Sequence, residues 1–181
     1  RTGPCQGSGA SSILAGRIHS KNKTREVFGG IPWFALEIAR ELEVPVRIIT
    51  NVGKDFPLNN IPDDVLKLSS VGVVDRQTTS LDIYADERNV PAIVRTFTGE
   101  IKNIKSLKGS LIIVSPLFQE VGPSSLVDLR KNFDTTILDI QGFTRPPFTE
   151  NINLSDNIKI QPDNLSELLE VIDILKCSDN E

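Results

Sequence analysis

The apolar residues between positions 31 and 50 follow two different periods. Over residues 32–43 they recur at spacings of three and four, which predicts one face of a helix. Pro32 suits the first turn of this helix, and Pro45 ends the pattern. Residues 46–50 are rich in β-branched side chains and are expected to form a strand. The apolar positions assigned to the helix face are Ile31, Phe34, Ala35, Ile38, Ala39 and Leu42.

The second half of the chain repeats this alternation of strand and helix. Residues 111–114 and 136–140 are apolar runs, and the helix expected at 124–132 lies between them. A helix that joins two strands is the usual crossover of a parallel sheet, and strands apolar on both faces need helices on both sides. Further strands are expected at 12–16 and 157–160, and a last helix at 165–175.

The middle of the chain has a different pattern, with two short strands at 80–85 and 92–97 joined by a polar turn. Apolar Leu81 and Ile83 alternate with polar Asp82 in the first of them. Such alternation is typical of an antiparallel hairpin that keeps one face in water. A hairpin is therefore expected to interrupt the strand–helix alternation.

Together these elements predict an α/β fold, a three-layer sandwich with a mainly parallel sheet and a small antiparallel hairpin at about 78–98. The chain of 181 residues is long enough for one domain with its own core, which we place at 12–181. Residues 1–11 are rich in glycine and serine and are expected to be a leader or an expression-derived segment.

Composition narrows the function classes. The net charge is −4, which disfavours a general nucleic-acid binder because such proteins normally carry a basic face. The two cysteines, Cys5 and Cys177, are too few for a disulfide framework, so a reducing cytoplasm is expected. The single histidine, His19, leaves a zinc site without ligands, and no apolar run is long enough to span a membrane.

Two candidate binding motifs lie beside the first expected helix. Gly29 and Gly30 directly precede it, where glycines let a ligand approach backbone N–H groups at a helix N-terminus. The alternative is a plain tight turn. Asp55 follows the strand at 46–50, at the edge where open α/β sheets place ligands, and its alternative is a solvated turn residue.

Three further candidates lie late in the chain. Asp139 is near the carboxyl end of a buried strand and close to Gln141, where a carboxylate must be paired or face a site. Asn164 and Glu167 precede or begin the last helix, either as an N-cap pair or with the carboxylate orienting metal-bound water near phosphates. His19 has no visible triad partner and is expected in a loop or on the surface.

Taken in order, these motifs resemble the ribokinase-like (PfkB) carbohydrate kinases, and in particular a subgroup of inositol- and sugar-type kinases. The resemblance covers about residues 12–176 and rests on the order and spacing of motifs that are each short. The matching segments are 12–16 as first strand, Gly29-Gly30, 48–55 with its Val-Gly-x-Asp, the lid beginning at 78–80, the Asp-x-Gln-Gly-Phe-x-Arg stretch 139–145, and Asn164-x-x-Glu167.

The resemblance implies a parent protein that transfers a phosphoryl group from ATP, with Mg²⁺, to a hydroxyl of a sugar or polyol. The substrate would bind between the lid and the edge of the sheet, and the lid edge could join two copies in a homodimer. No nucleic-acid or membrane partner is implied. The substrate-binding residues would be Asn22, Gly29, Gly30, Asp55, Asp139 and Gln141, and the nucleotide- and magnesium-associated residues Asn164 and Glu167.

The chain departs from the family pattern at two points. Asn22 is the only polar candidate where the family has an acidic residue that holds substrate hydroxyls. The Thr-Gly-x-Gly-Asp motif, which supplies the anion hole and the catalytic base, is absent after the match. We therefore expect no catalytic residue and no turnover from these residues alone. The alternative to an incomplete kinase is a non-catalytic sugar- or nucleotide-binding regulatory protein on the same fold.

Overall fold

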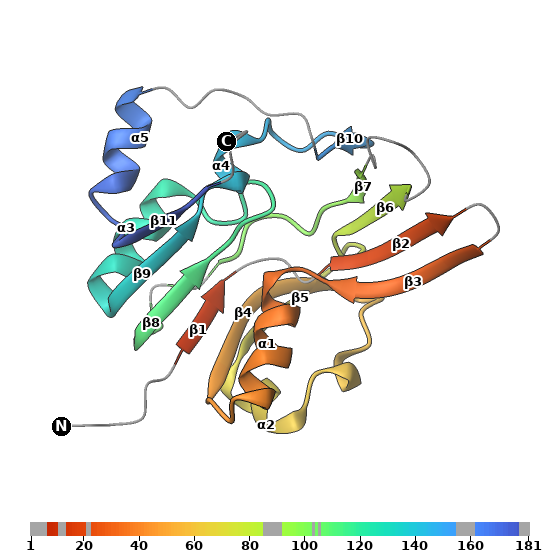
Figure 1. Ribbon diagram of the computed structural model, residues 1–181, viewed down its shortest axis with the longest axis horizontal. Coiled ribbons are helices and arrows are strands. Elements are labelled where there is room, and N and C mark those ends of the chain that lie inside the picture. The colour runs from red at the N-terminus through yellow and green to blue at the C-terminus, as the bar shows by residue number, and fades with distance from the viewer. Residues whose placement is uncertain are drawn as a thin grey trace.

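The chain folds around two sheets, of which the larger contains only parallel pairs. The computed structural model describes residues 7–10, 14–20, 23–84, 92–102, 104, 106–154 and 162–177. The strand order of this main sheet is β11-β9-β8-β1-β4-β5 (Figure 1). Its strands are β1 (Gly7–Ala10), β4 (Val46–Gly53), β5 (Ser70–Val74), β8 (Gly109–Val114), β9 (Phe133–Asp139) and β11 (Ile174–Lys176).

Helices lie on both faces of the main sheet, as the apolar strands require. Ile48 of β4 belongs to a core cluster with α1 and α2, while its neighbour Ile49 belongs to a cluster with α3 and α5. Because consecutive strand residues point to opposite faces, the two helix pairs cover opposite sides. The helices are α1 (Ile31–Glu41), η1 (Leu58–Asn60), α2 (Asp63–Leu68), α3 (Pro123–Asn132), α4 (Gln141–Thr144) and α5 (Pro162–Leu169).

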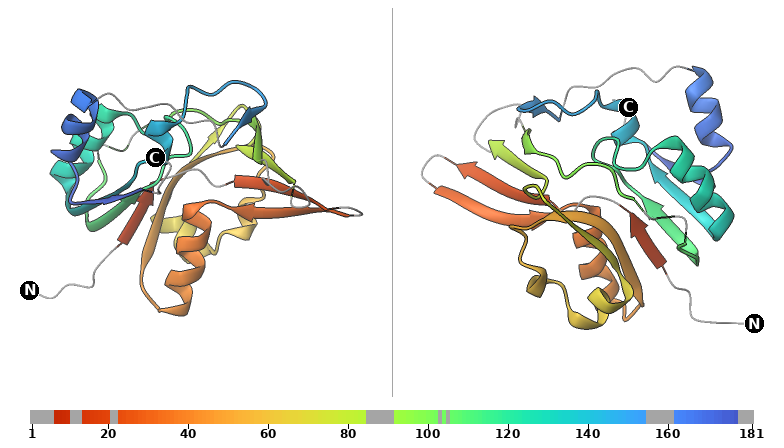
Figure 2. Two further views of the ribbon diagram at one scale, coloured as in Figure 1. Left: turned by 45° about the horizontal axis from the view of Figure 1, so that its top comes forward. Right: turned by 180° about the vertical axis from the view of Figure 1, so that it is seen from behind.

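The expected lid hairpin is part of a larger second sheet, which we call the lid sheet. Figure 2 shows it extending to one side of the main sheet, with the β2–β3 hairpin as its far end. The strand order is β10-β7-β6-β2-β3; β2 and β6 are parallel, and the other pairs are antiparallel. Its strands are β2 (Leu14–Ser20), β3 (Lys23–Gly29), β6 (Ser80–Tyr84), β7 (Ala92–Thr96) and β10 (Ile152–Asn153).

The first strand lies earlier than the sequence predicted. β1 is Gly7–Ala10, within the opening stretch that we expected to be a leader, and it pairs with β4 on one side and β8 on the other. The strand expected at 12–16 is wrong in position, because residues 14–16 begin β2 of the lid sheet. Glycine is depleted in strands, so β1 has no strand pattern of its own and depends on its two partners.

The end of the chain also differs from the prediction. The helix expected at 165–175 ends at Leu169, and Ile174–Lys176 forms β11 beside β9. Asp173 ties this turn to the sheet, since its carboxylate accepts a hydrogen bond of 2.8 Å from the Thr136 N–H. The strand expected at 157–160 lies outside the described residues. Within the described ranges, no helix is long and apolar enough to cross a membrane.

The helix predicted at 32–43 is present as α1, but a different face of it is buried. Pro32, Leu36 and Ala39 are the buried residues, and of these only Ala39 was assigned to the core. Phe34 and Ile38, which we had placed on the buried face, are 57% and 59% exposed. The helix is apolar on more than one side, so periodicity alone could not choose the side that meets the sheet.

Candidate functional site

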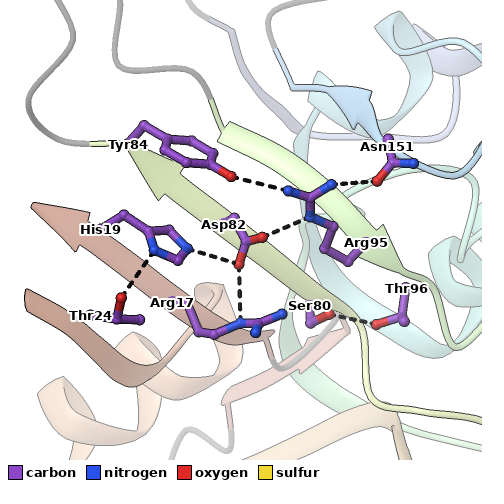
Figure 3. Close-up of polar contacts among 9 residues, drawn as sticks. All are labelled: Arg17, His19, Thr24, Ser80, Asp82, Tyr84, Arg95, Thr96 and Asn151. Atoms are coloured by element: carbon purple, nitrogen blue, oxygen red, sulfur yellow. Dashed lines mark hydrogen bonds and ion pairs between the residues drawn. The ribbon is translucent and has the colours of Figure 1, made fainter.

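Five polar or aromatic side chains gather on one face of the lid sheet, and we call them the lid cluster: Arg17, His19, Asp82, Tyr84 and Arg95. The parallel register of β2 and β6 places Arg17 opposite Asp82 and His19 opposite Tyr84. Residues two apart on a strand share a face, so these four side chains are adjacent. Arg95 joins them from β7, on the other side of β6 (Figure 3).

Asp82 is the centre of the lid cluster and is only 5% exposed. Its Oδ2 accepts a hydrogen bond of 2.7 Å from Arg95 Nε, and its Oδ1 lies 3.1 Å from Arg17 Nε and 3.3 Å from His19 Nε2. The His19 ring stacks on Tyr84 with 4.9 Å between centroids. Figure 3 shows the carboxylate held between these three nitrogen-bearing side chains.

Arg95 links Asp82 to two further groups. Its Nη2 donates to the Tyr84 hydroxyl at 3.1 Å, and its Nη1 donates to Oδ1 of Asn151. Asn151 has a positive φ of 65°, a conformation that asparagine tolerates better than most residues. The guanidinium is therefore fixed in orientation by one carboxylate, one phenol and one amide.

The cluster changes the protonation equilibrium of its carboxylate. Burial by itself would raise the pKa of Asp82, because it disfavours the charged form. Hydrogen bonds from Arg95 and His19 and the positive charge of Arg17 outweigh burial, so that the pKa of Asp82 is lowered. In return, the hydrogen bond and charge of Asp82 raise the pKa of Arg95. The lid cluster thus holds an ionised carboxylate between fixed cations.

The lid cluster lies on the face of the lid sheet that is turned toward α1. Thr24 and Phe28 of β3 are an even number of residues apart and so share one face, and Thr24 contacts the His19 ring at 3.2 Å. Phe28 packs against Trp33 of α1 and against Phe56, with centroid distances of 5.6 and 5.3 Å. The cluster and the start of α1 therefore border the same side of the molecule.

The opposite face of the lid sheet is apolar and packs on the body of the protein. Leu81 and Val94 form a buried cluster with Leu117 and Phe118, which follow β8. This packing fixes the lid sheet against the carboxyl end of β8 and leaves the lid cluster on the other face.

The two predicted glycines have different roles in the local structure. Gly30 caps α1 with φ of 87°, a conformation that residues with a side chain rarely adopt. Gly29 ends β3, and a Cβ there would meet only the Phe34 ring at 3.8 Å, an ordinary contact. Gly30 is thus explained by backbone geometry, whereas nothing in the packing requires a glycine at position 29.

The Asp55 carboxylate forms hydrogen bonds within the fold. Its Oδ1 accepts hydrogen bonds of 2.8 Å from both the backbone N–H and the hydroxyl of Thr78. Gly53 allows this close approach, because a Cβ would lie 2.3 Å from the Thr78 nitrogen. This arrangement joins the end of β4 to the entry of β6, and a substrate-binding role for Asp55 stays a prediction.

Asp139 and Gln141 belong to a network at the carboxyl ends of β8 and β9. Asp139 is 2% exposed and accepts hydrogen bonds from Lys176 Nζ at 2.7 Å and from the Ser115 hydroxyl at 3.2 Å. Gln141 accepts from Arg145 at 3.1 Å. The predicted need for a partner at Asp139 is met inside the fold, and the predicted substrate contacts of both residues are untested.

The remaining predicted residues do not assemble into a described site. Asn22 lies outside the described residues, and the side chain of Asn164 does as well. Glu167 is an exposed residue of α5. In the part of the chain that the structure describes, no three His, Cys, Asp or Glu side chains converge on one point. The roles of Asn164 and Glu167 stay predictions.

Sequence reasoning missed most of the lid cluster. His19 was expected on the surface or in a loop without a carboxylate partner; it lies in β2 and contacts Asp82. The available signal was the pair Arg17 and His19, two positions apart, which fits a strand with one polar face. The alternation of Asp82 and Tyr84 along β6 was the matching signal on the neighbouring strand.

A pocket of about 530 Å³ lies beside β4 and β5. It is lined by residues of β4, β5 and the segment 98–102, including Asn51 and Arg76. Asn51 Nδ2 already donates to the Glu100 carbonyl at 2.8 Å, and Lys54 pairs with Asp75 on the rim. We assign no chemistry to this pocket.

Comparison with solved structures shows a ribokinase-like fold. A pyrophosphate-dependent kinase in the ribokinase family, complexed with a pyrophosphate analog and myo-inositol, matches 94% of this chain with a TM-score of 0.72 and 16% identity. Arabidopsis thaliana ribokinase complexed with ribose and ATP matches 97% with a TM-score of 0.64 and 16% identity. A nucleoside kinase from Methanocaldococcus jannaschii matches 97% with a TM-score of 0.62 and 15% identity.

The chain spans less than two thirds of the length of each of these solved structures. This chain covers 60% of the pyrophosphate-dependent kinase, 60% of the ribokinase and 62% of the nucleoside kinase. No family model and no curated protein matches the sequence. At such identities the likeness establishes the fold, including the mainly parallel sheet that the sequence predicted, and leaves activity and substrate to be proposed.

Proposed function

Taking the ribokinase-like fold as the premise, we propose that this chain is the substrate-binding part of a cytoplasmic kinase that phosphorylates a hydroxyl of a sugar or polyol. The phosphoryl donor is ATP with Mg²⁺, as the sequence motifs imply. The observation that carries the proposal is the lid cluster, a set of fixed hydrogen-bonding groups on the face turned toward α1. A hydroxyl-rich ligand needs several donors and acceptors in fixed positions, and few flat surfaces offer them.

The side chains of the lid cluster divide into ligand-contacting and positioning groups. The side chain of Arg17 is 51% exposed and that of Arg95 is 34% exposed, so both guanidinium groups can reach a ligand. The Asp82 side chain is 7% exposed and holds both of them. Asp82 is therefore a positioning residue, and Arg17 with the Tyr84 hydroxyl is proposed to contact the ligand hydroxyls.

The proposed site also includes the start of α1, which borders the same side as the lid cluster. The first turn of this helix has no side-chain cap and no acidic residue, so its N–H groups have no competing protein anion. Gly29 has no packing reason to lack a side chain, which fits a position where a ligand comes close. Gly29, Gly30, Asp55, Asp139 and Gln141 remain proposed substrate-binding residues.

Ligand binding is tested by thermal unfolding of the 181-residue chain with myo-inositol, fructose, ribose and adenosine in turn. A ligand that binds only the folded state raises the midpoint, by an amount set by its concentration relative to its dissociation constant. At least one of the four compounds is expected to raise the midpoint of thermal unfolding. The substitution Arg17→Gln is expected to weaken this binding at least about tenfold, the usual effect of losing a charged hydrogen bond.

The matched control is Arg40→Gln, an exposed arginine on the far part of α1 that should leave binding unchanged. The proposal fails if none of the four compounds raises the unfolding midpoint, or if Arg40→Gln weakens binding as much as Arg17→Gln.

The alternative function is a regulatory protein that binds a sugar or nucleotide without turnover. The absence of Thr-Gly-x-Gly-Asp from this sequence favours it for the 181 residues taken alone. Phosphoryl transfer is measured with the polypeptide encoded by the uninterrupted gene, using the sugar that stabilises the short chain and either ATP or pyrophosphate. Product formation supports the kinase, and tight binding without product supports the regulator.

A homodimer through the lid is proposed from the exposed edge of the lid sheet. β3 is its last strand, and residues 23–26 are exposed. Unpaired strand edges invite a second strand, so two copies are expected to associate there. Sedimentation velocity of Thr24→Pro, which prevents edge pairing, should show a monomer where the parent chain shows a dimer. A monomeric parent chain would remove this proposal.

A further inference from the structure

The groups of the lid cluster that have no partner within the described residues are hydrogen-bond donors. Arg17 lies 3.1 Å from Asp82 through its Nε, and its side chain is 51% exposed. Its two Nη groups have no partner in the described part of the chain (Figure 3). The Tyr84 hydroxyl accepts from Arg95 Nη2 at 3.1 Å, so its own proton is available for donation. A ligand on this face therefore meets donors from two side chains.

The acceptors of the lid cluster already have partners inside the protein. Asp82 Oδ2 accepts from Arg95, and its Oδ1 lies within 3.3 Å of His19 Nε2. His19 Nδ1 contacts the Thr24 hydroxyl at 3.2 Å. The hydroxyl of a neutral polyol both donates and accepts, so it needs both kinds of partner. Donors without acceptors are matched instead by the oxygens of an ionised carboxylate or phosphate.

The charge around the lid cluster also favours an anion. Residues 17–25 contain four Lys or Arg side chains and no Asp or Glu, in a chain whose net charge is −4. Lys23 and Arg25 of β3 are exposed, and Lys21 lies outside the described residues. A local excess of positive charge attracts anions, most strongly at low salt. The β2–β3 hairpin is thus the end of the lid sheet that an anionic ligand approaches.

We infer that the lid cluster binds an anionic group of its ligand, so that the ligand is a sugar or polyol that already carries a phosphate or a carboxylate. The Arg17 guanidinium offers two parallel N–H groups, which suit two oxygens of one such group. The buried Asp82 carboxylate holds this guanidinium in place. The inference rests on the proposed function, which makes the lid cluster a ligand site, and it names the class of ligand.

Glu26 allows the sign of the ligand charge to be tested. The antiparallel register places it directly opposite Arg17, on the same face of the lid sheet. Glu26 is exposed and forms no ion pair with any described residue. Its carboxylate repels an anion that binds at Arg17, whereas a neutral ligand is not affected by this repulsion. Removal of the Glu26 charge therefore distinguishes the two kinds of ligand.

The test compares neutral compounds with their anionic counterparts by isothermal titration calorimetry of the 181-residue chain. The pairs are ribose with ribose 5-phosphate, fructose with fructose 6-phosphate, and sorbitol with gluconate, which separate phosphate from carboxylate. At least one anionic compound is expected to bind at least about tenfold more tightly than its neutral counterpart, the usual effect of a charged hydrogen bond. Added salt is expected to reduce this difference.

Two variants assign the preference to the lid cluster. Arg17→Gln is expected to bring the anionic compound to within about threefold of its neutral counterpart, because the paired donors and their charge are lost. Glu26→Gln is expected to raise the affinity for the anionic compound by roughly threefold, the repulsion of two nearby unit charges in water. A gain of affinity cannot result from misfolding. The matched control is Glu170→Gln, which removes the same charge from an exposed residue directly after α5 and should change neither affinity.

Each contrary result separates this inference from the proposed function. Neutral compounds that bind as tightly as their anionic counterparts overturn the inference and leave the proposed sugar or polyol site in place. A preference for anions that Arg17→Gln leaves unchanged also overturns it, because the anion then binds elsewhere. So does inorganic phosphate that binds as tightly as ribose 5-phosphate, since the site then takes an ion alone. If no compound of the three pairs binds, the inference and the proposed function both fail.

Discussion

Asp82 is a buried carboxylate with two arginines and a histidine around it, and its neutralisation tests the whole lid cluster. Asp82→Asn keeps the shape but removes the charge that holds Arg17 and Arg95. We expect the free energy of unfolding at pH 7 to fall by about 1 to 2 kcal/mol, because charged hydrogen bonds are lost and the cations remain. Urea denaturation measures this. Asp75→Asn is the control, since Asp75 is 89% exposed and its pair with Lys54 contributes little.

The same carboxylate predicts a pH dependence of stability. The pKa of Asp82 in the folded protein is lowered, below the value of about 3.9 for an unfolded aspartate. Its stabilisation is therefore complete above that value and is lost as the pH falls through the folded-state pKa. The difference in unfolding free energy between the parent chain and Asp82→Asn should shrink as the pH drops below about 4. A difference as large at pH 3 as at pH 7 would contradict this account.

Gly142, in the Gln-Gly-Phe stretch, is explained by a close approach of backbone rather than by a ligand. A Cβ there would lie 2.2 Å from the Phe118 carbonyl oxygen and 2.6 Å from that of Pro116. Gly142→Ala is expected to destabilise the protein by about 1 to 3 kcal/mol, the usual range for overpacking. Gly122→Ala is the control, because a Cβ at Gly122 meets nothing within 4 Å. Thermal unfolding of both variants decides whether the close approach matters.

At the scale of elements, Phe28 joins the lid sheet to α1. Its ring contacts Trp33 and Phe56, whereas Phe34, one turn of α1 from its start, is mostly exposed. Phe28→Ala is expected to lower the unfolding free energy by about 2 to 3 kcal/mol, below the cost of a fully buried phenylalanine. Phe34→Ala in the 181-residue chain should cost less than about 0.5 kcal/mol. Similar losses in urea denaturation for the two variants would show that the packing is assigned wrongly.

The sequence predicted the helices and strands whose hydrophobic pattern is contained in their own residues. β4, β8, α3 and the β6–β7 pair were all expected, because each has a clear period or an apolar run of its own. It missed β1, β2 and β11, whose residues form strands only beside their partners. For the same reason the lid was predicted as a hairpin and not as five strands.

The candidate site was harder to predict than the elements. Gly30, Asp55 and Asp139 were found by their positions next to strands and helices. The structure explains Gly30 by its backbone conformation and the two aspartates by local hydrogen bonds. The lid cluster was missed because it joins residues about 65 positions apart, Arg17 and Asp82, through a parallel register that no short pattern encodes.

At the scale of the whole molecule, the predicted α/β fold with a mainly parallel sheet is confirmed by the solved structures that it resembles. In the proposed function, the main sheet supplies the rigid support and the lid sheet supplies the groups that contact the ligand. Binding is therefore expected to depend on the lid cluster and stability on both sheets. Parallel measurement of ligand affinity and unfolding free energy in each variant separates the two.

The order of strands in the lid sheet also governs when the protein can fold during synthesis. β6 and β7 are made about 60 residues after β2 and β3, and β10 begins only at residue 152, yet all five lie in one sheet. β1 is made before these strands, but one of its two partners, β8, begins at residue 109. Such distant pairings make folding slow. The first third of the chain therefore leaves the ribosome with unpaired strand edges, and it depends on chaperones or on rapid synthesis to reach its partners unaggregated.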